Sequence, residues 1–114
     1  MTTMPRRRRT IQERTNAPRV TERAFQSQVE QYARMMGWLV SHAFLSIGSV
    51  GGFPDLICLR GGVMVVAELK STTGKTTEAQ ELWLFSFRAV PGVTVKLWKP
   101  DDDSWADIER TLGR

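Results

Sequence analysis

Apolar side chains follow helical spacing after residue 20 and strand spacing directly afterwards. Between Thr21 and Met36 they recur at steps of three and four residues, which is typical of an amphipathic helix with Thr21 as its N-cap and Gly37 as its stop. The apolar stripe of this helix consists of Phe25, Val29, Tyr32 and Met36. Residues 38–44 then place apolar side chains on both alternating faces, so we expect an interior strand there.

Two apolar segments and a glycine pair predict a β-hairpin next. Residues 55–60 and 63–70 are rich in branched aliphatic side chains, and only Gly61-Gly62 separates them, which is typical of a two-residue turn. The loop before the hairpin, residues 45–52, is rich in Gly and Ser, so it can be mobile and let one backbone approach another closely. The elements expected after the hairpin are a helix from Thr77 to Val90 that opens with a capping box, a strand over residues 93–98, and a short helix capped by Ser104 and ending at Leu112.

This order of elements, αβββαβ with a terminal helix, predicts an α/β fold. Only the connection through the second helix can form a parallel crossover, so we expect a mixed central sheet flanked by helices. The chain has 114 residues, of which 41% are hydrophobic, and this suits one folded domain with its own core.

The predicted hairpin brings charged residues together at one of its ends. If Arg60 pairs with Val63 across the turn, counting back along both strands places Asp55 directly opposite Glu68. Opposed side chains share a face, with Cβ atoms roughly 4.5 to 5.5 Å apart. Lys70 projects from that same face because strand side chains alternate. Two carboxylates and an ammonium group therefore converge.

A divalent cation is the natural companion of such a carboxylate pair. The two acids repel each other, and each is costly to keep ionised beside apolar neighbours such as Ile57 and Val66 unless a cation lies between them. Carboxylate oxygens without a nearby Cys or His cluster favour Mg²⁺ or Mn²⁺ over zinc. With Lys70 to orient a water or offset charge on a phosphate, the arrangement predicts phosphodiester hydrolysis. The alternative is a hairpin end that carries an ordinary Glu–Lys ion pair.

The positive charge of the chain is concentrated in its first 19 residues. They carry six Arg and one Glu, a net of +5, which leaves −1 for residues 20–114 of the formal total of +4. We therefore divide the chain into a basic arm, residues 1–19, expected to be disordered when free, and a folded domain, residues 20–114. The run Arg6, Arg7, Arg8 and Arg9 either contacts a DNA backbone through salt-sensitive charge neutralisation or serves as a solubilising tail.

Two further features bear on where the protein works. No apolar run is long enough for a signal peptide or a membrane span, so we expect a soluble, cytoplasmic protein with no membrane partner. Cys58 is the only cysteine, which excludes an internal disulfide. It falls on the hairpin face opposite Asp55, so its expected role is packing.

A helix that carries an acid, a three-strand meander with Pro-Asp and Glu-x-Lys, and then a helix and a strand resemble the PD-(D/E)xK nuclease superfamily, whose fold is restriction-endonuclease-like. The resemblance covers residues 21–100, and the motifs that carry it are Gly37-Trp38-Leu39-Val40, Gly52-Phe53-Pro54-Asp55-Leu56-Ile57, Glu68-Leu69-Lys70, Gly74-Lys75 and Gln80. These motifs look most like the VRR-Nuc, or virus-type replication-repair nuclease, branch.

The resemblance assigns roles to the residues at the hairpin end. It implies that Asp55 and Glu68 ligate Mg²⁺ or Mn²⁺, with the main-chain carbonyl of Leu69 as a further ligand. It also implies that Lys70 positions the attacking water.

The resemblance further implies a metal-binding glutamate on the first helix. The sequence offers Glu22 and Glu30, with Gln26 between them. At 100° per residue, Glu22 lies roughly 50° from the centre of the apolar stripe, whereas Glu30 lies roughly 130° away and should face solvent. We therefore choose Glu22, although related junction resolvases place their acid nearer Gln26. The alternative role of Glu22 is that of a first-turn acid favoured by the helix dipole.

Other polar residues have two interpretations each. Gln80 matches a family position near the active site and either binds a phosphate or the water network, or closes the capping box. Lys75 either contacts a DNA phosphate or is an ordinary loop lysine. His42, Ser46 and Asp55 can be combined into a hydrolase triad, but no nucleophile-elbow motif accompanies them, so we expect His42 to pack within its strand.

The expected activity is that of a Mg²⁺- or Mn²⁺-dependent DNA endonuclease. Stand-alone members of the family resemble junction resolvases, which implies branched or Holliday-junction-like DNA as the substrate. Paired incisions require a two-fold homodimer, and apolar residues of the second helix such as Trp83 and Phe87 either form its contact or pack on the sheet. The competing functions are a non-catalytic nucleic-acid-binding module and a nuclease subunit that is active only with a partner protein.

Overall fold

Four strands and three helices follow one another in the part of the chain that the computed structural model describes, residues 20–42 and 51–114. In chain order they are α2 (Glu22–Met35), β1 (Leu39–His42), β2 (Leu56–Arg60), β3 (Val63–Leu69), α3 (Glu78–Arg88), β4 (Val93–Trp98) and α4 (Asp102–Leu112). The predicted order of elements is confirmed. None of these described helices has the length and apolar character needed to cross a membrane.

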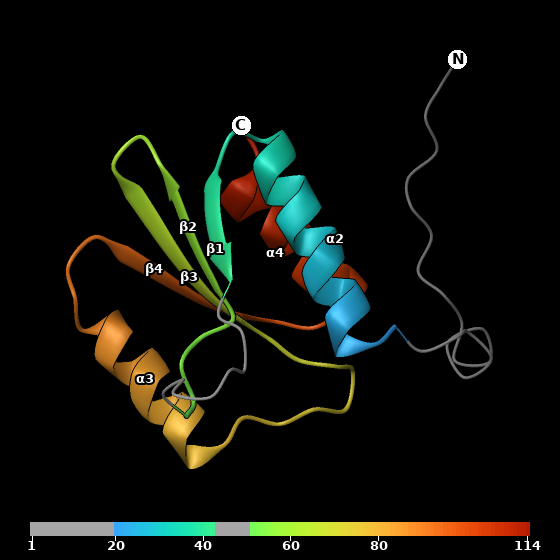
Figure 1. Ribbon diagram of the computed structural model, residues 1–114, viewed down its shortest axis with the longest axis vertical. Coiled ribbons are helices and arrows are strands. Elements are labelled where there is room, and N and C mark those ends of the chain that lie inside the picture. Colours follow the sequence, from blue (N-terminus) through green and yellow to red (C-terminus); the bar gives the residue numbers. More distant parts are fainter. Residues whose placement is uncertain (1–19, 43–50) are drawn as a thin grey trace.

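The strands form one mixed sheet in the order β1-β2-β3-β4 (Figure 1). The first three pair as an antiparallel meander, whereas β4 lies parallel to β3 after the crossover through α3, as predicted. The expectation of an interior strand over residues 38–44 is wrong, because β1 is at the edge of the described sheet and Leu39 is 72% exposed. Leu39 lies on the face that α2 and α4 leave open, so its apolar character does not lead to burial.

The turn of the hairpin fixes the pairing of β2 with β3. Gly61 and Gly62 have φ values of 55° and 82°, and a two-residue turn of type I′ requires positive φ at both positions. Arg60 consequently pairs with Val63, and the ladder continues residue by residue to the far end of β2. This is the predicted register.

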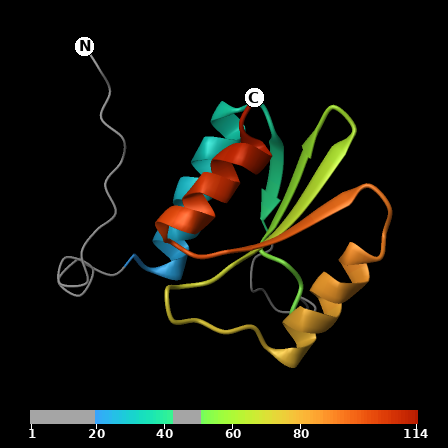
Figure 2. The ribbon, with the colours of Figure 1, turned by 180° about the vertical axis from the view of Figure 1, so that it is seen from behind.

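The core lies between the sheet and the layer formed by α2 and α4. These two helices run side by side over one face, and the sheet separates them from α3, which lies against β4 (Figure 2). The buried residues of this core are Phe25, Val29, Ala33, Trp38, Leu56, Cys58, Val65, Ala67, Leu69, Trp98, Ile108 and Leu112. The packing role expected for Cys58 is confirmed.

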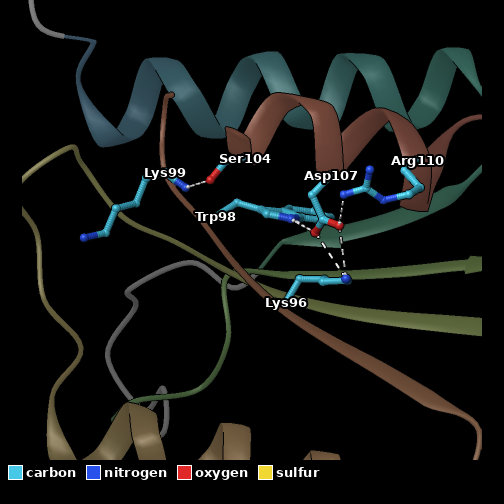
Figure 3. Close-up of polar contacts among 6 residues, drawn as sticks. All are labelled: Lys96, Trp98, Lys99, Ser104, Asp107 and Arg110. Atoms are coloured by element: carbon cyan, nitrogen blue, oxygen red, sulfur yellow. Dashed lines mark hydrogen bonds and ion pairs between the residues drawn. The ribbon is translucent and has the colours of Figure 1, made fainter. Parts of the chain in front are cut away.

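The start of α4 differs from the prediction. Asp101, not Ser104, is the N-cap, since the Asp101 side chain accepts a hydrogen bond from the Ser104 N–H at 2.7 Å. The Ser104 hydroxyl instead accepts from the Lys99 N–H at 3.0 Å (Figure 3). The assignment of the cap to Ser104 is wrong because Asp is as good a cap as Ser and stands one turn earlier.

Asp107 fastens α4 to β4 (Figure 3). Its carboxylate accepts a hydrogen bond from Trp98 Nε1 at 2.8 Å and lies 3.1 Å from both Lys96 Nζ and a terminal nitrogen of Arg110. Burial alone would raise the pKa of Asp107, but the hydrogen bonds from these three residues outweigh burial and hold the pKa below its usual value.

Arg60 fastens the ends of α2 and α4 to the hairpin. Its guanidinium group donates hydrogen bonds to the main-chain oxygens of Met36 at 2.8 Å and Gly113 at 2.9 Å. The same group lies 4.3 Å from the ring centre of Trp38, whose Nε1 donates to the Leu112 carbonyl at 2.7 Å. The end of β2 opposite the acids is thereby held rigidly in the fold.

Candidate active site

Asp55 and Glu68 meet at the end of the hairpin that lies away from its turn. The β2–β3 ladder runs from the Arg60–Val63 pair toward these two residues, so their side chains share a face. The Asp55 carboxyl group is near enough to Glu68 to raise the pKa of the Glu68 carboxyl group. Asp55 Oδ2 also accepts a hydrogen bond from the Leu69 N–H at 2.7 Å. The structure thus brings together the two acids that the hairpin count places opposite each other.

The surroundings of Glu68 disfavour its charged form. The residue is 1% exposed, and its Oε2 has no hydrogen-bond partner among the described residues. Burial raises the pKa of Glu68 to about 9, with the hydrogen bond and the negative charge of Asp55 adding to the rise and the ammonium group of Lys70 opposing it. A buried oxygen without a donor is uncommon in folded proteins, so it marks a position that a ligand can fill.

The donor atoms at this position fit a hard divalent cation. Asp55 and Glu68 offer carboxylate oxygens, the ligands that Mg²⁺ and Mn²⁺ prefer, and the Leu69 carbonyl is the further ligand that the resemblance implies. A positive charge here would favour the ionised form of Glu68, which burial disfavours. Within residues 20–42 and 51–114 no three His, Cys, Asp or Glu side chains form a ready metal cage. A site of few protein ligands suits Mg²⁺, because this ion usually keeps several waters.

Lys70 is held beside the acids by its backbone and by the turn that follows it. Its N–H donates to the Trp98 carbonyl at 3.0 Å, which continues the pairing of β3 with β4 beyond the end of both strands. The Gly74 N–H donates to the Ser71 carbonyl at 3.0 Å, and this turn folds back so closely that a Cβ at Gly74 would lie 3.4 Å from the Lys70 Cβ. Lys70 is 8% exposed, and its charge opposes the rise in the pKa of Glu68.

Glu22 is the α2 glutamate whose charge reaches the acid pair. It is exposed in the first turn of α2, and its charge is one of the contributions that raise the pKa of Glu68. Gln26, one turn further along the helix, is half-buried. The end of α2 that carries Glu22 therefore faces the end of the sheet that carries the acids.

The expectation that Glu30 faces solvent is wrong. The residue is 9% exposed, and its Oε1 lies 3.3 Å from the guanidinium group of Arg34. Burial and, second, the charge of Glu30 raise the pKa of the Cys58 thiol to about 11. The centre of the helical wheel is displaced because Ala33 is fully buried, whereas Tyr32 is only partly buried. Glu30 consequently lies on the packed side of α2, beside the core.

The loop that leads into β2 is fixed against α3. Gly52 has a φ of 84°, and a Cβ there would lie 2.5 Å from the carbonyl carbon of Ala79, so only glycine fits. Phe53 then meets Trp83 and Phe87 edge to face, with ring centres 5.1 and 6.0 Å apart. The glycine-rich composition predicted a close approach here. It gave no indication of the aromatic contacts, for which the only signal is a Phe placed between Gly and Pro.

Gln80 closes the capping box of α3. Its Oε1 accepts a hydrogen bond from the Thr77 N–H at 2.9 Å, and its own N–H donates to the Thr77 hydroxyl at 3.2 Å. The capping interpretation is confirmed. The side-chain NH₂ group is the part of Gln80 that remains to contact a phosphate or a water.

The other candidate residues lie at or beyond the margin of the site. Lys75 is exposed on the loop between β3 and α3. His42 pairs through its main chain with Leu56. Ser46 and the run Arg6, Arg7, Arg8 and Arg9 lie outside the described residues, as does the loop over residues 43–50.

Neither a scan against protein-family models nor a search of curated proteins finds a match to this chain. Solved structures do resemble it. One, described as a "VRR_NUC domain protein", has a TM-score of 0.63 over 83% of this chain and 89% of its own, at 19% sequence identity. Another, described as a "VRR_NUC domain", has a TM-score of 0.55 over 80% of this chain and 94% of its own, at 25% identity. The chain therefore has the α/β, restriction-endonuclease-like fold that the motifs predicted.

Proposed function

We propose that this chain, which has the fold of VRR_NUC domains, is a Mg²⁺- or Mn²⁺-dependent endonuclease that hydrolyses phosphodiester bonds in DNA. The observation that carries the proposal is the buried, unpartnered Oε2 of Glu68 beside Asp55. This pair of acids does not stabilise the end of an apolar hairpin, because burial and the charge of Asp55 both disfavour the charged form of Glu68. A divalent cation removes that disadvantage, so the arrangement makes physical sense as part of a metal site.

Each residue at the hairpin end has a defined task in this proposal. Asp55 and Glu68, with the Leu69 carbonyl and with Glu22 from α2, would hold the cation. When bound, a cation of this kind polarises the scissile phosphate and lowers the pKa of an attacking water. The ammonium group of Lys70 orients that water and offsets the negative charge that grows on the phosphate oxygens in the transition state. The main-chain hydrogen bond of Lys70 to β4 keeps this group in place.

The DNA contacts belong to the margin of the same site. Lys75, exposed on the loop after β3, would neutralise a backbone phosphate, and Arg6, Arg7, Arg8 and Arg9 of the arm would add salt-sensitive affinity. The free NH₂ group of Gln80 would bind a phosphate or a water near the acids. None of these contacts reads base sequence, which fits an enzyme that selects DNA by its shape.

We infer that branched DNA, such as a four-way junction, is the substrate and that a homodimer cuts it. Leu82 is 65% and Phe85 71% exposed on α3, so the single chain leaves large apolar side chains uncovered. They support a two-fold contact through α3 better than Trp83 and Phe87 do, because those two are half-buried beside Phe53. A two-fold dimer would present two active sites to one junction, as paired incisions require.

The test is cleavage of labelled duplex, flap, single-stranded and four-way DNA with Mg²⁺ or Mn²⁺. Asp55→Ala and Lys70→Ala should each abolish cleavage while leaving DNA binding largely intact. Glu109→Ala, which removes an exposed acid on α4, is the matched control and should cut like the wild type. A wild type that cuts none of these substrates with either metal would contradict the proposal.

A competing function is that of a non-catalytic nucleic-acid-binding module, in which the arm supplies the affinity and the acids have only a structural role. Under that function the wild type binds DNA but never cuts it, and Asp55→Ala has no effect on the bound complex. A subunit that depends on a partner protein would cut only when the partner is added. The lone cysteine and a DNA substrate agree with the expected cytoplasmic location.

A further inference from the structure

We propose that Lys99 binds a backbone phosphate of DNA next to the phosphate that is cut. The proposal rests on the nuclease function above and adds a binding residue that no sequence motif indicates. Lys99 stands directly after β4, at the end of the sheet where the acid pair lies.

The backbone places Lys99 beside Lys70. Leu69 pairs with Trp98 in the parallel ladder, and the Lys70 N–H donates to the Trp98 carbonyl at 3.0 Å. The residue after this pair is Lys70 on the β3 side and Lys99 on the β4 side. Neighbouring strands lie about 4.8 Å apart. Lys99 continues the row of residues that ends in the candidate active site.

The side chain of Lys99 leaves the sheet on the face of Glu68. Trp98 points into the core and is 1% exposed, whereas Leu97, which pairs with Glu68, is 40% exposed on the opposite face. Because side chains alternate along a strand, the side chain of Lys99 projects from the same face of the sheet as that of Leu97. Figure 3 shows its side chain pointing away from Asp107 and the cluster around that residue.

The main chain of Lys99 is held on both sides. Its N–H donates to the Ser104 hydroxyl at 3.0 Å, and its carbonyl accepts from the Asp101 N–H at 2.8 Å. Pro100 follows and restricts the backbone further. The ammonium group therefore extends from a fixed point, which lowers the entropy lost when it meets a ligand.

Lys99 lacks the anionic partner that Lys96 and Arg110 have. Lys96, on the other face of β4, and Arg110 both pair with Asp107 at 3.1 Å. Within residues 20–42 and 51–114 no carboxylate lies within ion-pair distance of the Lys99 ammonium group. A DNA strand that crosses the acids at the end of β3 would pass the end of β4 next, and there its phosphate would supply the missing negative charge.

The experiment compares Lys99→Ala with Lys96→Gln as the matched control, since both remove one lysine charge from the same strand segment. Binding to a fluorescent four-way junction is measured by anisotropy between about 50 and about 300 mM salt, with Asp55→Ala as the common background so that the DNA stays intact. Cleavage is measured separately in chains that retain Asp55. Thermal melts verify that each variant is folded.

Loss of one phosphate contact should reduce the slope of log affinity against log salt by about 0.9, which weakens binding about eightfold at 0.1 M salt. Lys99→Ala should show this change, should raise KM and should leave kcat unaltered, whereas Lys96→Gln should keep the parental slope. Lys99→Arg should restore the parental slope.

A parental slope in Lys99→Ala, or an equal loss in Lys96→Gln, would overturn the inference. If the wild type nevertheless cuts DNA, the nuclease function survives that result. A wild type that neither binds nor cuts any of the DNA substrates would contradict both the nuclease function and the role of Lys99.

Discussion

Replacing Glu68 with Gln should stabilise the metal-free protein and abolish the proposed nuclease activity. The amide keeps the size of the buried side chain and can donate a hydrogen bond toward Asp55, as the protonated acid can, without taking up a proton on folding. It also has no charge to lose on folding. Removal of a proposed metal ligand should therefore raise stability, the opposite of the usual effect of a core substitution.

The size of the effect follows from the pKa of Glu68, which rises from 4.5 to about 9 on folding. An acid whose pKa is raised on folding binds more protons in the folded state than in the unfolded state. The stability of the protein is therefore highest below the pKa of the unfolded state, and it falls as pH rises toward the pKa of the folded state. At pH 7 the free energy of unfolding is lower by about 3 kcal/mol, because each pH unit above the pKa of the unfolded state costs about 1.4 kcal/mol. For a domain of this size, that corresponds to roughly 10 °C or more in Tm.

The assay is urea unfolding followed by tryptophan fluorescence, in chelator, at several pH values between about 4.5 and about 9. The advantage of Glu68→Gln over the wild type should grow across that window, while Glu109→Gln, at an exposed position on α4, should stay close to wild type throughout. Adding Mg²⁺ should stabilise the wild type, by about 2.7 kcal/mol at a hundred times Kd, and not the variant. A variant that is less stable than the wild type at pH 7, or an advantage that does not change with pH, would refute the reasoning.

Other substitutions test the contacts around the site. Gly52→Ala should lower the free energy of unfolding by roughly 2 kcal/mol or more, because alanine is strained at positive φ and its Cβ would collide with Ala79; an unchanged urea midpoint would contradict this. Arg60→Ala should lose roughly 2 to 4 kcal/mol of stability with its charged hydrogen bonds and its contact with Trp38, and a loss below about 0.5 kcal/mol in the same assay would show that the clamp is unimportant. Asp107→Asn should lose about 1 kcal/mol at pH 7. Because the pKa of Asp107 is lowered on folding, its contribution is present above the unfolded value and disappears as pH falls through the folded value, so thermal melts of wild type and variant should converge in acid; a constant difference would disprove this cause.

The acid pair could be predicted from sequence because a short turn determines pairing. With only Gly61-Gly62 between the strands, the register and the shared face of Asp55 and Glu68 followed from counting. Local signals were also sufficient for the capping box at Thr77 and for the parallel crossover.

Other parts of the site depend on contacts between distant segments. The burial of Glu30 follows from the way α2 packs on the sheet and α4, which a helical wheel of α2 alone does not contain. The exposure of Leu39 depends on which face of the sheet the helices leave open. The position of Lys99 next to Lys70 depends on a parallel register that no turn determines, since a whole helix separates the two strands. Sequence patterns report local geometry, and these features are not local.

The glycine turn of the hairpin determines, from a distance, whether Asp55 and Glu68 lie on the same face. It lies about 17 Å along the strands from the two acids, and a Cβ at Gly61 or Gly62 would touch nothing within 4 Å. Deleting one of these glycines would leave a connection too short for the present register, and a strand that re-pairs one residue away presents its opposite face. Asp55 and Glu68 would then diverge, so a deletion that removes none of the proposed site residues would abolish the proposed activity.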